Sequence, residues 1–278
     1  MTTIKGGRVV IKFGGSSIAG GPDTARFAND ISRLVLEGFQ PIIVHGGGPE
    51  ITAEMERRGL KATKVRGLRV TDMATLEVAK TVLARINDQL VSALQDEGLK
   101  AMGLAGSEAF TLQCHKMAPK QVKNEDGTMI EVDLGLVGEV IGVDARCLNL
   151  ILAEDVIPVL YPIGCDGKGQ LYNVNADTAA AKVATAVQAK EFVLVTDVPG
   201  ILRDIRDPSS LIKKVTLKDA QTLIEDGVVK EGMIPKLEAC MTAVKGGVPA
   251  AHMINGKDHD SIIGQLLQGK SCGTTITK

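Results

Sequence analysis

The segment VVIKFGGSS at residues 9–17 decides the fold of this chain, because a short apolar run ends there in two glycines. A second segment of the same kind, PIIVHGGGP, covers residues 41–49. Each segment predicts a buried strand that leads into a loop with free backbone N–H groups. Such loops bind anions, because glycine lets a ligand oxygen approach the main chain and accepts positive φ angles. The two loops therefore indicate a protein that handles phosphate groups.

Apolar runs alternate with helical periodicity along most of the chain. We expect strands at 8–13, 41–45, 156–160, 192–195, 250–254 and 273–276, and helices at 22–37, from 49, at 74–97 and at 176–187. Short apolar runs between helices predict strands that are buried on both faces. The sequence therefore predicts an α/β fold with a central, mainly parallel sheet and right-handed crossovers.

The segment 116–140 departs from this pattern. It contains Pro119, the turn sequence NEDG at 124–127 and flanking β-branched residues, which predict a β-hairpin that can act as a lid. No internal repeat or obvious linker divides the chain. We therefore expect two lobes, residues 1–175 and 176–278, with the boundary in the short connection near 170–176.

Composition excludes several classes of function. The 278 residues suffice for one large α/β domain or two lobes, and a formal net charge of −1 argues against nucleic-acid and membrane partners. No run reaches the roughly 18 apolar residues of a membrane span. The five cysteines are scattered without a C-x-x-C pair, and the histidines lack metal-ligand spacing, so we expect no zinc site and a cytoplasmic location.

The remaining motifs are specific in combination. The chain has neither a P-loop nor a G-x-G-x-x-G segment after a strand. It carries instead GLRVTD at 67–72, YNVNAD at 172–177, TDVPGIL at 196–202 and GMIPK at 232–236. Together with the two glycine loops, these motifs resemble the amino acid kinase family over nearly the whole chain. The resemblance implies a three-layer αβα sandwich, with the phosphoryl acceptor in the N-terminal lobe and ATP in the C-terminal lobe.

Within that family the motifs are similar to those of members that phosphorylate N-acetyl-L-glutamate. The resemblance thus implies ATP-dependent transfer to the side-chain carboxylate, in arginine biosynthesis, with Mg²⁺ held mainly by phosphates and water. A sister kinase acting on glutamate or carrier-linked aminoadipate is one alternative, although the third glycine, Gly48, favours N-acetylglutamate over the carrier-linked substrate. A sensor of the same fold that binds without catalysis is the other.

Three charged residues are implied to carry the chemistry. An ionised carboxylate needs no general base, so the obstacle is bringing an anion against a polyanion. By resemblance, Lys12 and Lys236 flank the migrating phosphoryl group and Asp177 orients both lysines. From the sequence alone, Lys12 could also be a lysine that snorkels at a strand end, and Asp177 could be a helix N-cap or first-turn charge.

The other site residues are also carried over by resemblance. Backbone N–H groups of Gly14 and Gly15 would hold phosphate oxygens, whereas Gly47 and Gly48 would hold the acceptor. The glycine run at 46–48 could alternatively be only a tight turn. Arg69 would bind the acceptor's α-carboxylate as a bidentate donor, Asn173 would bind its acylated amino group, and Asn175 would support that loop. The residues implied to receive the nucleotide are Thr196, Asp197, Gly200 and Gly232.

The chain departs from its family in places. It has Ile86-Asn87-Asp88 where such kinases often show Val-Asn-Lys. This difference bears on how the acceptor is bound more than on phosphoryl transfer. Eleven residues precede Lys12, fewer than the N-terminal helix of hexameric, arginine-inhibited members requires. We therefore expect a homodimer without arginine inhibition, although the segment 251–256 resembles part of the arginine-binding region of those members.

Overall fold

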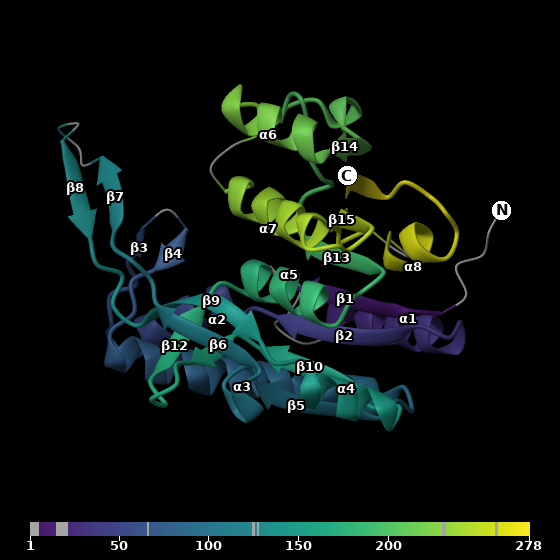
Figure 1. Cartoon of the computed structure of the whole chain (residues 1–278), viewed down its shortest axis with the longest axis horizontal. Coiled ribbons are helices and arrows are strands. Elements are labelled where there is room, and N and C mark those ends of the chain that lie inside the picture. Colours follow the sequence, from purple (N-terminus) through teal and green to yellow (C-terminus); the bar gives the residue numbers. More distant parts are fainter. Residues whose placement is uncertain are drawn as a thin grey trace.

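A computed structural model describes residues 6–14, 22–65, 67–123, 126, 128–229, 232–258 and 261–278. An eight-stranded sheet forms its centre (Figure 1). In spatial order the strands are β14 (Lys214–Thr216), β16 (Gly273–Thr277), β15 (Ala250–Asn255), β13 (Glu191–Thr196), β1 (Arg8–Phe13), β2 (Gln40–His45), β10 (Ile157–Tyr161) and β5 (Ala101–Ala105). Neighbours pair in parallel except β15 and β16, which confirms the predicted, mainly parallel sheet.

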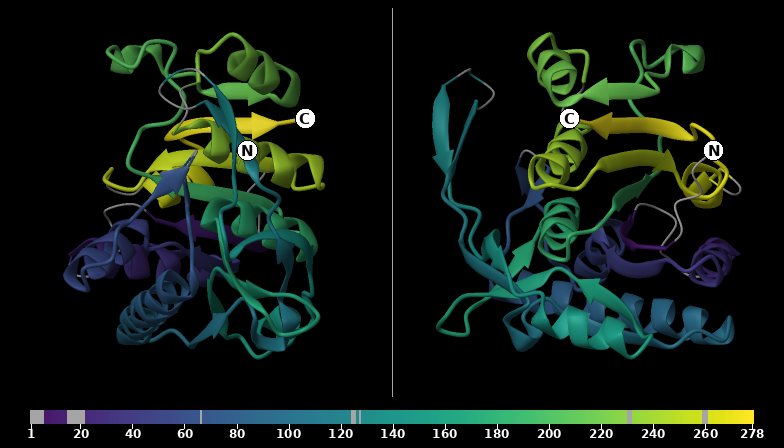
Figure 2. Two further views of the ribbon diagram at one scale, coloured as in Figure 1. Left: turned by 90° about the vertical axis from the view of Figure 1, so that its left-hand side faces the viewer. Right: turned by 45° about the vertical axis from the view of Figure 1, so that its right-hand side comes forward.

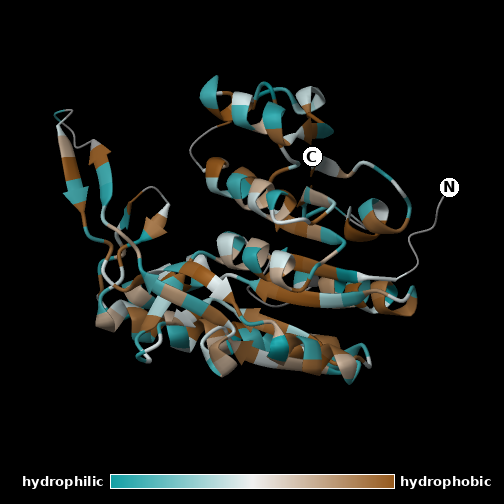
Figure 3. Cartoon of the chain, viewed as in Figure 1, coloured by the Kyte–Doolittle hydropathy of each residue, from teal (hydrophilic) through white to brown (hydrophobic). Residues whose placement is uncertain are grey.

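Helices cover both faces of this sheet. One face packs against α5 (Ala176–Ala186), α7 (Ile234–Lys245), α4 (Arg146–Ala153) and α6 (Leu217–Glu225). The other packs against α1 (Pro22–Leu36), α2 (Gly48–Arg57), α3 (Met73–Asp96) and α8 (Ser261–Leu266). Alternate residues of β1 enter the two cores, so its apolar run is continuous, and the middle strands are correspondingly brown in Figure 3. The predicted αβα sandwich is confirmed.

A second, smaller β-structure lies beside the sheet. The strands β6 (Leu112–Lys116), β9 (Val137–Val143), β12 (Leu171–Val174) and β11 (Ile163–Cys165) close into a four-stranded barrel. From β6 and β9 the antiparallel hairpin of β7 (Lys120–Lys123) and β8 (Met129–Val132) projects away from the body (Figure 2). The predicted hairpin is confirmed, although most of its NEDG turn, residues 124, 125 and 127, lies outside the described residues. The barrel was not predicted, because strands this short leave little pattern.

The site is positioned by the carboxyl ends of the parallel strands. β1, β2, β10 and β13 are parallel neighbours, so the loops that follow them meet at one edge of the sheet, where α/β proteins bind ligands. A two-stranded ribbon, β3 (Lys64–Val65) and β4 (Leu68–Arg69), stands near the same end (Figure 1). Within the described residues, no helix is long and apolar enough to cross a membrane. All five cysteines are free.

Candidate active site

Asp177 lies in the first turn of α5, directly after β12. The N-cap of this helix is Asn175, whose side-chain oxygen accepts a hydrogen bond from the backbone N–H of Thr178 at 2.9 Å. Because Asn175 caps the helix, the Asp177 carboxylate is free to face β1. Of the two helix positions considered for Asp177, the structure therefore shows the first turn and not the N-cap. The N-cap is Asn175, the residue predicted to support this loop.

The Asp177 carboxylate joins two lysines from distant parts of the chain. Lys12 Nζ, from β1, lies 2.9 Å from Oδ1, and Lys236 Nζ, from the start of α7, lies 3.0 Å from Oδ2. Lys12 and Asp177 are almost fully buried, with side chains 7% and 8% exposed, whereas that of Lys236 is 24% exposed. Pro235 stands in the first turn of α7, as expected, and directs the following lysine to this point.

The charge of this triad is unbalanced. Burial alone would raise the pKa of Asp177, but the ammonium groups of Lys12 and Lys236 outweigh it and lower the pKa to about 2. The carboxylate is therefore ionised at neutral pH. Two cations around one anion leave a net positive charge in a buried place, which favours a negatively charged ligand.

Gly14 makes room for the folded-back side chain of Lys12. A Cβ atom at residue 14 would overlap Lys12 Nζ and lie 2.8 Å from its Cε. The glycine is thus required by the lysine as well as by any ligand. Gly15, the other predicted phosphate-binding glycine of this loop, lies outside the described residues.

Gly14→Ala is expected to lower turnover by on the order of 10²-fold, because the new methyl group displaces the Lys12 amine by about an ångström or more. Steady-state kinetics and a thermal unfolding curve check this. Gly167→Ala is the matched control, since no atom lies within 4 Å of the added Cβ there. Equal turnover in the two variants would contradict the role of Gly14.

A cavity of about 190 Å³ opens beside the lysine-carboxylate pair. Its lining includes the residues that the sequence predicted for catalysis, acceptor binding and loop support: Lys12, Gly47, Gly48, Arg69, Asn173, Asn175 and Asp177. Lys236 is not among the described lining residues, but its amine contacts Asp177, which is one of them. The structure therefore brings most of the predicted acceptor-site residues together, although they come from both the first and the second half of the chain.

Arg69 is a buried cation at this cavity. Its Nη2 donates to Gly48 O at 2.9 Å and to Thr52 Oγ1 at 2.7 Å, and its Nη1 contacts Met55 Sδ at 3.2 Å. Burial lowers the pKa of Arg69, yet arginine stays protonated in proteins. Within the described part of the chain no carboxylate forms an ion pair with it. A buried guanidinium without a counter-ion favours an anionic ligand in the cavity.

Arg69→Ala is expected to raise the KM for the acceptor by roughly 10- to 100-fold with a smaller change in kcat, because a charge-assisted hydrogen bond is lost. Arg57→Ala is the control, since Arg57 is an exposed arginine on α2 that pairs with Glu54. Initial rates at varied acceptor concentration check the prediction. An acceptor KM that stays at the wild-type value would refute the contact.

Asn173 is linked to Arg69 through a buried threonine. Its Nδ2 lies 3.3 Å from Thr71 Oγ1, and that hydroxyl donates to Arg69 O at 2.8 Å. Sequence reasoning missed both Thr71 and Thr52. The GLRVTD motif contains Thr71, but no pattern in the sequence pointed to its contact with a strand about a hundred residues away.

Gly47 and Gly48 form the turn from β2 into α2. Gly47 is the N-cap of α2, and Ile51 N donates to Gly47 O at 2.9 Å. A Cβ at Gly47 would lie 2.7 Å from Ile86 Cδ1 and 3.0 Å from Leu83 Cδ2, so α3 packs tightly against the turn. The helix N-terminus adds partial positive charge at the cavity.

The predicted nucleotide residues lie elsewhere on the same edge of the sheet. Thr196 ends β13 with its hydroxyl bonded to Val198, and Asp197 is exposed beside it. Gly200, at φ 136°, packs against Thr274, and Gly232 is exposed before α7. None of the four lines the cavity described above, so their assignment to a nucleotide stays a prediction.

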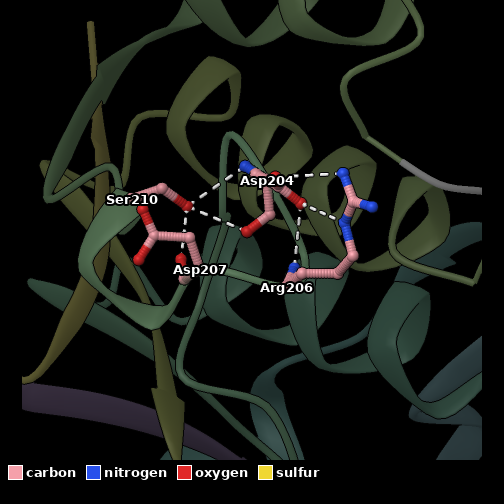
Figure 4. A network of polar contacts seen from close by, with 4 residues as sticks. All are labelled: Asp204, Arg206, Asp207 and Ser210. Carbon is pink, nitrogen blue, oxygen red and sulfur yellow. Dashed lines mark hydrogen bonds and ion pairs between the residues drawn. The ribbon is translucent and has the colours of Figure 1, made fainter.

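The loop between β13 and β14 is held by its own side chains. Ser210 Oγ lies 3.0 Å from Asp204 O and 2.6 Å from Asp207 O, which share its one hydroxyl proton, and Arg206 Nε donates to Asp204 Oδ1 at 3.3 Å (Figure 4). The described residues contain no group of three or more His, Cys, Asp or Glu side chains that could hold a metal ion.

The chain belongs to the amino acid kinase family, because it matches the sequence pattern described as "Amino acid kinase family" over residues 7–255. An acetylglutamate kinase of Heliobacterium modesticaldum is 42% identical to it over 274 residues, which cover 98% of this chain and 92% of that protein. An acetylglutamate kinase of Methanosarcina mazei is 44% identical over 269 residues, with 96% and 92% covered.

A solved structure shares the fold at lower sequence identity. The N-acetylglutamate synthase of Neisseria gonorrhoeae, in complex with coenzyme A and N-acetyl-glutamate, superposes with a TM-score of 0.81 at 24% identity. The match covers 98% of this chain but only 59% of the synthase, so this chain spans little more than half the length of that protein.

Proposed function

We propose that this protein transfers the γ-phosphoryl group of ATP to the side-chain carboxylate of N-acetyl-L-glutamate, which forms N-acetyl-L-glutamyl 5-phosphate in arginine biosynthesis. The single observation that carries the proposal is the buried Lys12–Asp177–Lys236 triad beside a cavity that Arg69 also lines. Full-length relatives named acetylglutamate kinase, at more than 40% identity, support the choice of substrate.

The transfer is mainly an electrostatic problem. A carboxylate oxygen attacks the γ-phosphorus, the bond to the β-phosphate oxygen breaks, and ADP leaves with that electron pair. Lys12 and Lys236 stabilise the negative charge that spreads over the transferring group, while Asp177 holds the two amines together. The backbone N–H groups of Gly14, Gly47 and Gly48 add oriented dipoles. No proton has to be removed from the acceptor.

We assign the acceptor to the half of the sheet formed by residues 1–175 and ATP to the half formed by residues 176–278. Residues 1–175 contribute β1, β2, β10 and β5, and residues 176–278 contribute the other four strands, which supports the proposed lobes. Arg69 would bind the α-carboxylate and Asn173 the acetamido group. ATP would lie near Thr196, Asp197, Gly200 and Gly232.

We propose that Mg²⁺ binds together with ATP. Both oxygens of Asp177 face lysines, so this carboxylate fits the role of orienting the amines rather than of a metal ligand. The ion would be held by phosphate oxygens and water, as is usual for Mg²⁺ with nucleotides. When bound, it would supply positive charge at the phosphates.

An ADP-release assay tests the substrate. Purified protein with ATP and Mg²⁺ is offered N-acetylglutamate, glutamate and acylated aminoadipate in parallel, and hydroxylamine traps the acyl phosphate as a hydroxamate. Release of ADP and hydroxamate with N-acetylglutamate alone is expected. A preference for another acceptor would support a sister kinase, and ligand binding without ADP release would support a sensor.

We further propose a homodimer and a cytoplasmic location. β5 is an edge strand of the described sheet, and its Met102 side chain is 50% exposed, which supports pairing with a second copy there. The five free cysteines agree with a reducing compartment. Light scattering coupled to gel filtration tests the dimer, and the mass of one chain would contradict it.

A further inference from the structure

We propose that His45 and Asn87 form a buried hydrogen-bond relay that fixes the direction of the Gly46–Gly47 peptide, and that both are positioning residues for the glycine loop. The inference rests on the proposed kinase function, because it explains how that loop is held ready for an acceptor oxygen. It concerns His45, one of the histidines without metal-ligand spacing, and Asn87, which belongs to the departure from the family at residues 86–88.

The relay is buried between β2, α3 and β10. His45, the last residue of β2, is fully buried, and Asn87 on α3 is 3% exposed. His45 Nε2 lies 3.0 Å from Asn87 Nδ2, and His45 Nδ1 lies 2.9 Å from Gly46 O. Asn87 Nδ2 also lies 2.9 Å from Val159 O.

The contact with Val159 settles how the Asn87 amide is oriented. A carbonyl oxygen only accepts, so the amide nitrogen must be the atom that faces Val159 O. The second N–H of the same nitrogen then points to His45 Nε2. On its other side, Asn87 Oδ1 lies against Gly103, where a Cβ would overlap it.

This orientation determines the tautomer of His45. Because the Asn87 nitrogen can only donate, His45 Nε2 must accept, and the ring proton therefore resides on Nδ1. Nδ1–H donates to Gly46 O. Burial lowers the pKa of His45 to about 4. The hydrogen bond to Gly46 opposes this shift, and the positive charge of Lys12 adds to it. The ring is therefore neutral at neutral pH.

The held carbonyl sets the direction of the next N–H group. The described residues contain no cis peptide bond, so the N–H of Gly47 points away from the Gly46 carbonyl and from the buried ring. Gly46 and Gly47 both line the cavity, whereas the fully buried His45 is not among its lining residues. A peptide between two glycines rotates with little steric resistance, so an external donor is needed to keep one orientation.

One pair of substitutions separates positioning from packing. In His45→Asn the amide nitrogen can occupy the place of Nδ1 and donate to Gly46 O, whereas in His45→Gln the amide reaches the place of Nε2 instead. We expect His45→Asn to stay within about threefold of the wild-type kcat/KM for the acceptor and His45→Gln to lose on the order of 10²-fold, as when one oriented donor is removed. Equal losses in the two variants would overturn the proposal.

A spectrum of the wild-type protein tests the tautomer without any substitution. With ¹⁵N-labelled histidine, the His45 signals, identified by their loss in His45→Asn, are expected to show a neutral ring with its proton on Nδ1. In Asn87→Leu, only the hydrogen bond to Gly46 O still selects the tautomer, so a smaller excess of the Nδ1–H form is expected. A wild-type ring protonated on Nε2 would overturn the inference whatever the kinetics. If the wild type lacked kinase activity, the proposed function would fail and this spectrum would still decide the tautomer.

Discussion

Lys12→Ala and Lys236→Ala are each expected to lower turnover by roughly 10³-fold or more, with a much smaller loss of affinity for ATP. Each amine meets the Asp177 carboxylate at about 3 Å, in a site that is largely closed to water. A charge in such a place interacts most strongly with the charge that develops during transfer, so its removal acts on the transition state more than on the bound substrate.

Single-turnover rates and ATP titrations measure the two effects separately. Lys80→Ala serves as the control, because Lys80 is a lysine on α3 that forms a surface ion pair with Glu77. If binding and turnover fell by the same factor, the two lysines would be binding groups and the transition-state role would be wrong.

Asp177→Asn is expected to impair both stability and turnover. The substitution leaves two ammonium groups together without a counter-charge, and breaking a buried ion pair from one side costs about 3 kcal/mol or more. The amines should then move apart, so turnover should fall by on the order of 10²-fold. Denaturant unfolding and steady-state kinetics measure the two losses. Unchanged values for both would exclude Asp177 as the residue that joins the lysines.

Asp133→Asn is the matched control for this variant. Asp133 pairs with Lys116 on the surface, where water and salt screen an ion pair and it contributes little to stability.

The wild-type contribution of Asp177 also depends on pH. Because its pKa is depressed from 3.8 to about 2 in the fold, its stabilisation is present above about pH 4 and is lost as the pH falls through 2. Asp177→Asn should lack that part of the acid dependence.

Much of the central sheet could be predicted, because its strands are buried on both faces and therefore appear as unbroken apolar runs. β1 and β2 are of this kind, and the helical period of α3 is equally regular. The barrel could not be predicted, since β11 has three residues and β12 has four. Its pairing is set by contacts between distant segments, which leave no local periodicity.

The candidate site divides in the same way. The family motifs singled out Lys12, Asp177 and Lys236, and the structure brings their charged atoms together. The contact between His45 and Asn87 was beyond the sequence, because the two residues are 42 positions apart and each has an ordinary explanation alone. Polar groups that meet only after folding can be recognised from coordinates but not from spacing.

The Lys12–Asp177–Lys236 triad has a consequence for how the molecule can be divided. Lys12 comes from the first half of the chain, and its counter-ion comes from the second. A fragment that ends before α5 would lose both the counter-ion of Lys12 and the helix that covers the apolar face of β1 and β2. The two halves cannot therefore be exchanged or expressed as independent modules, and truncation at their boundary should yield aggregates rather than a working lobe.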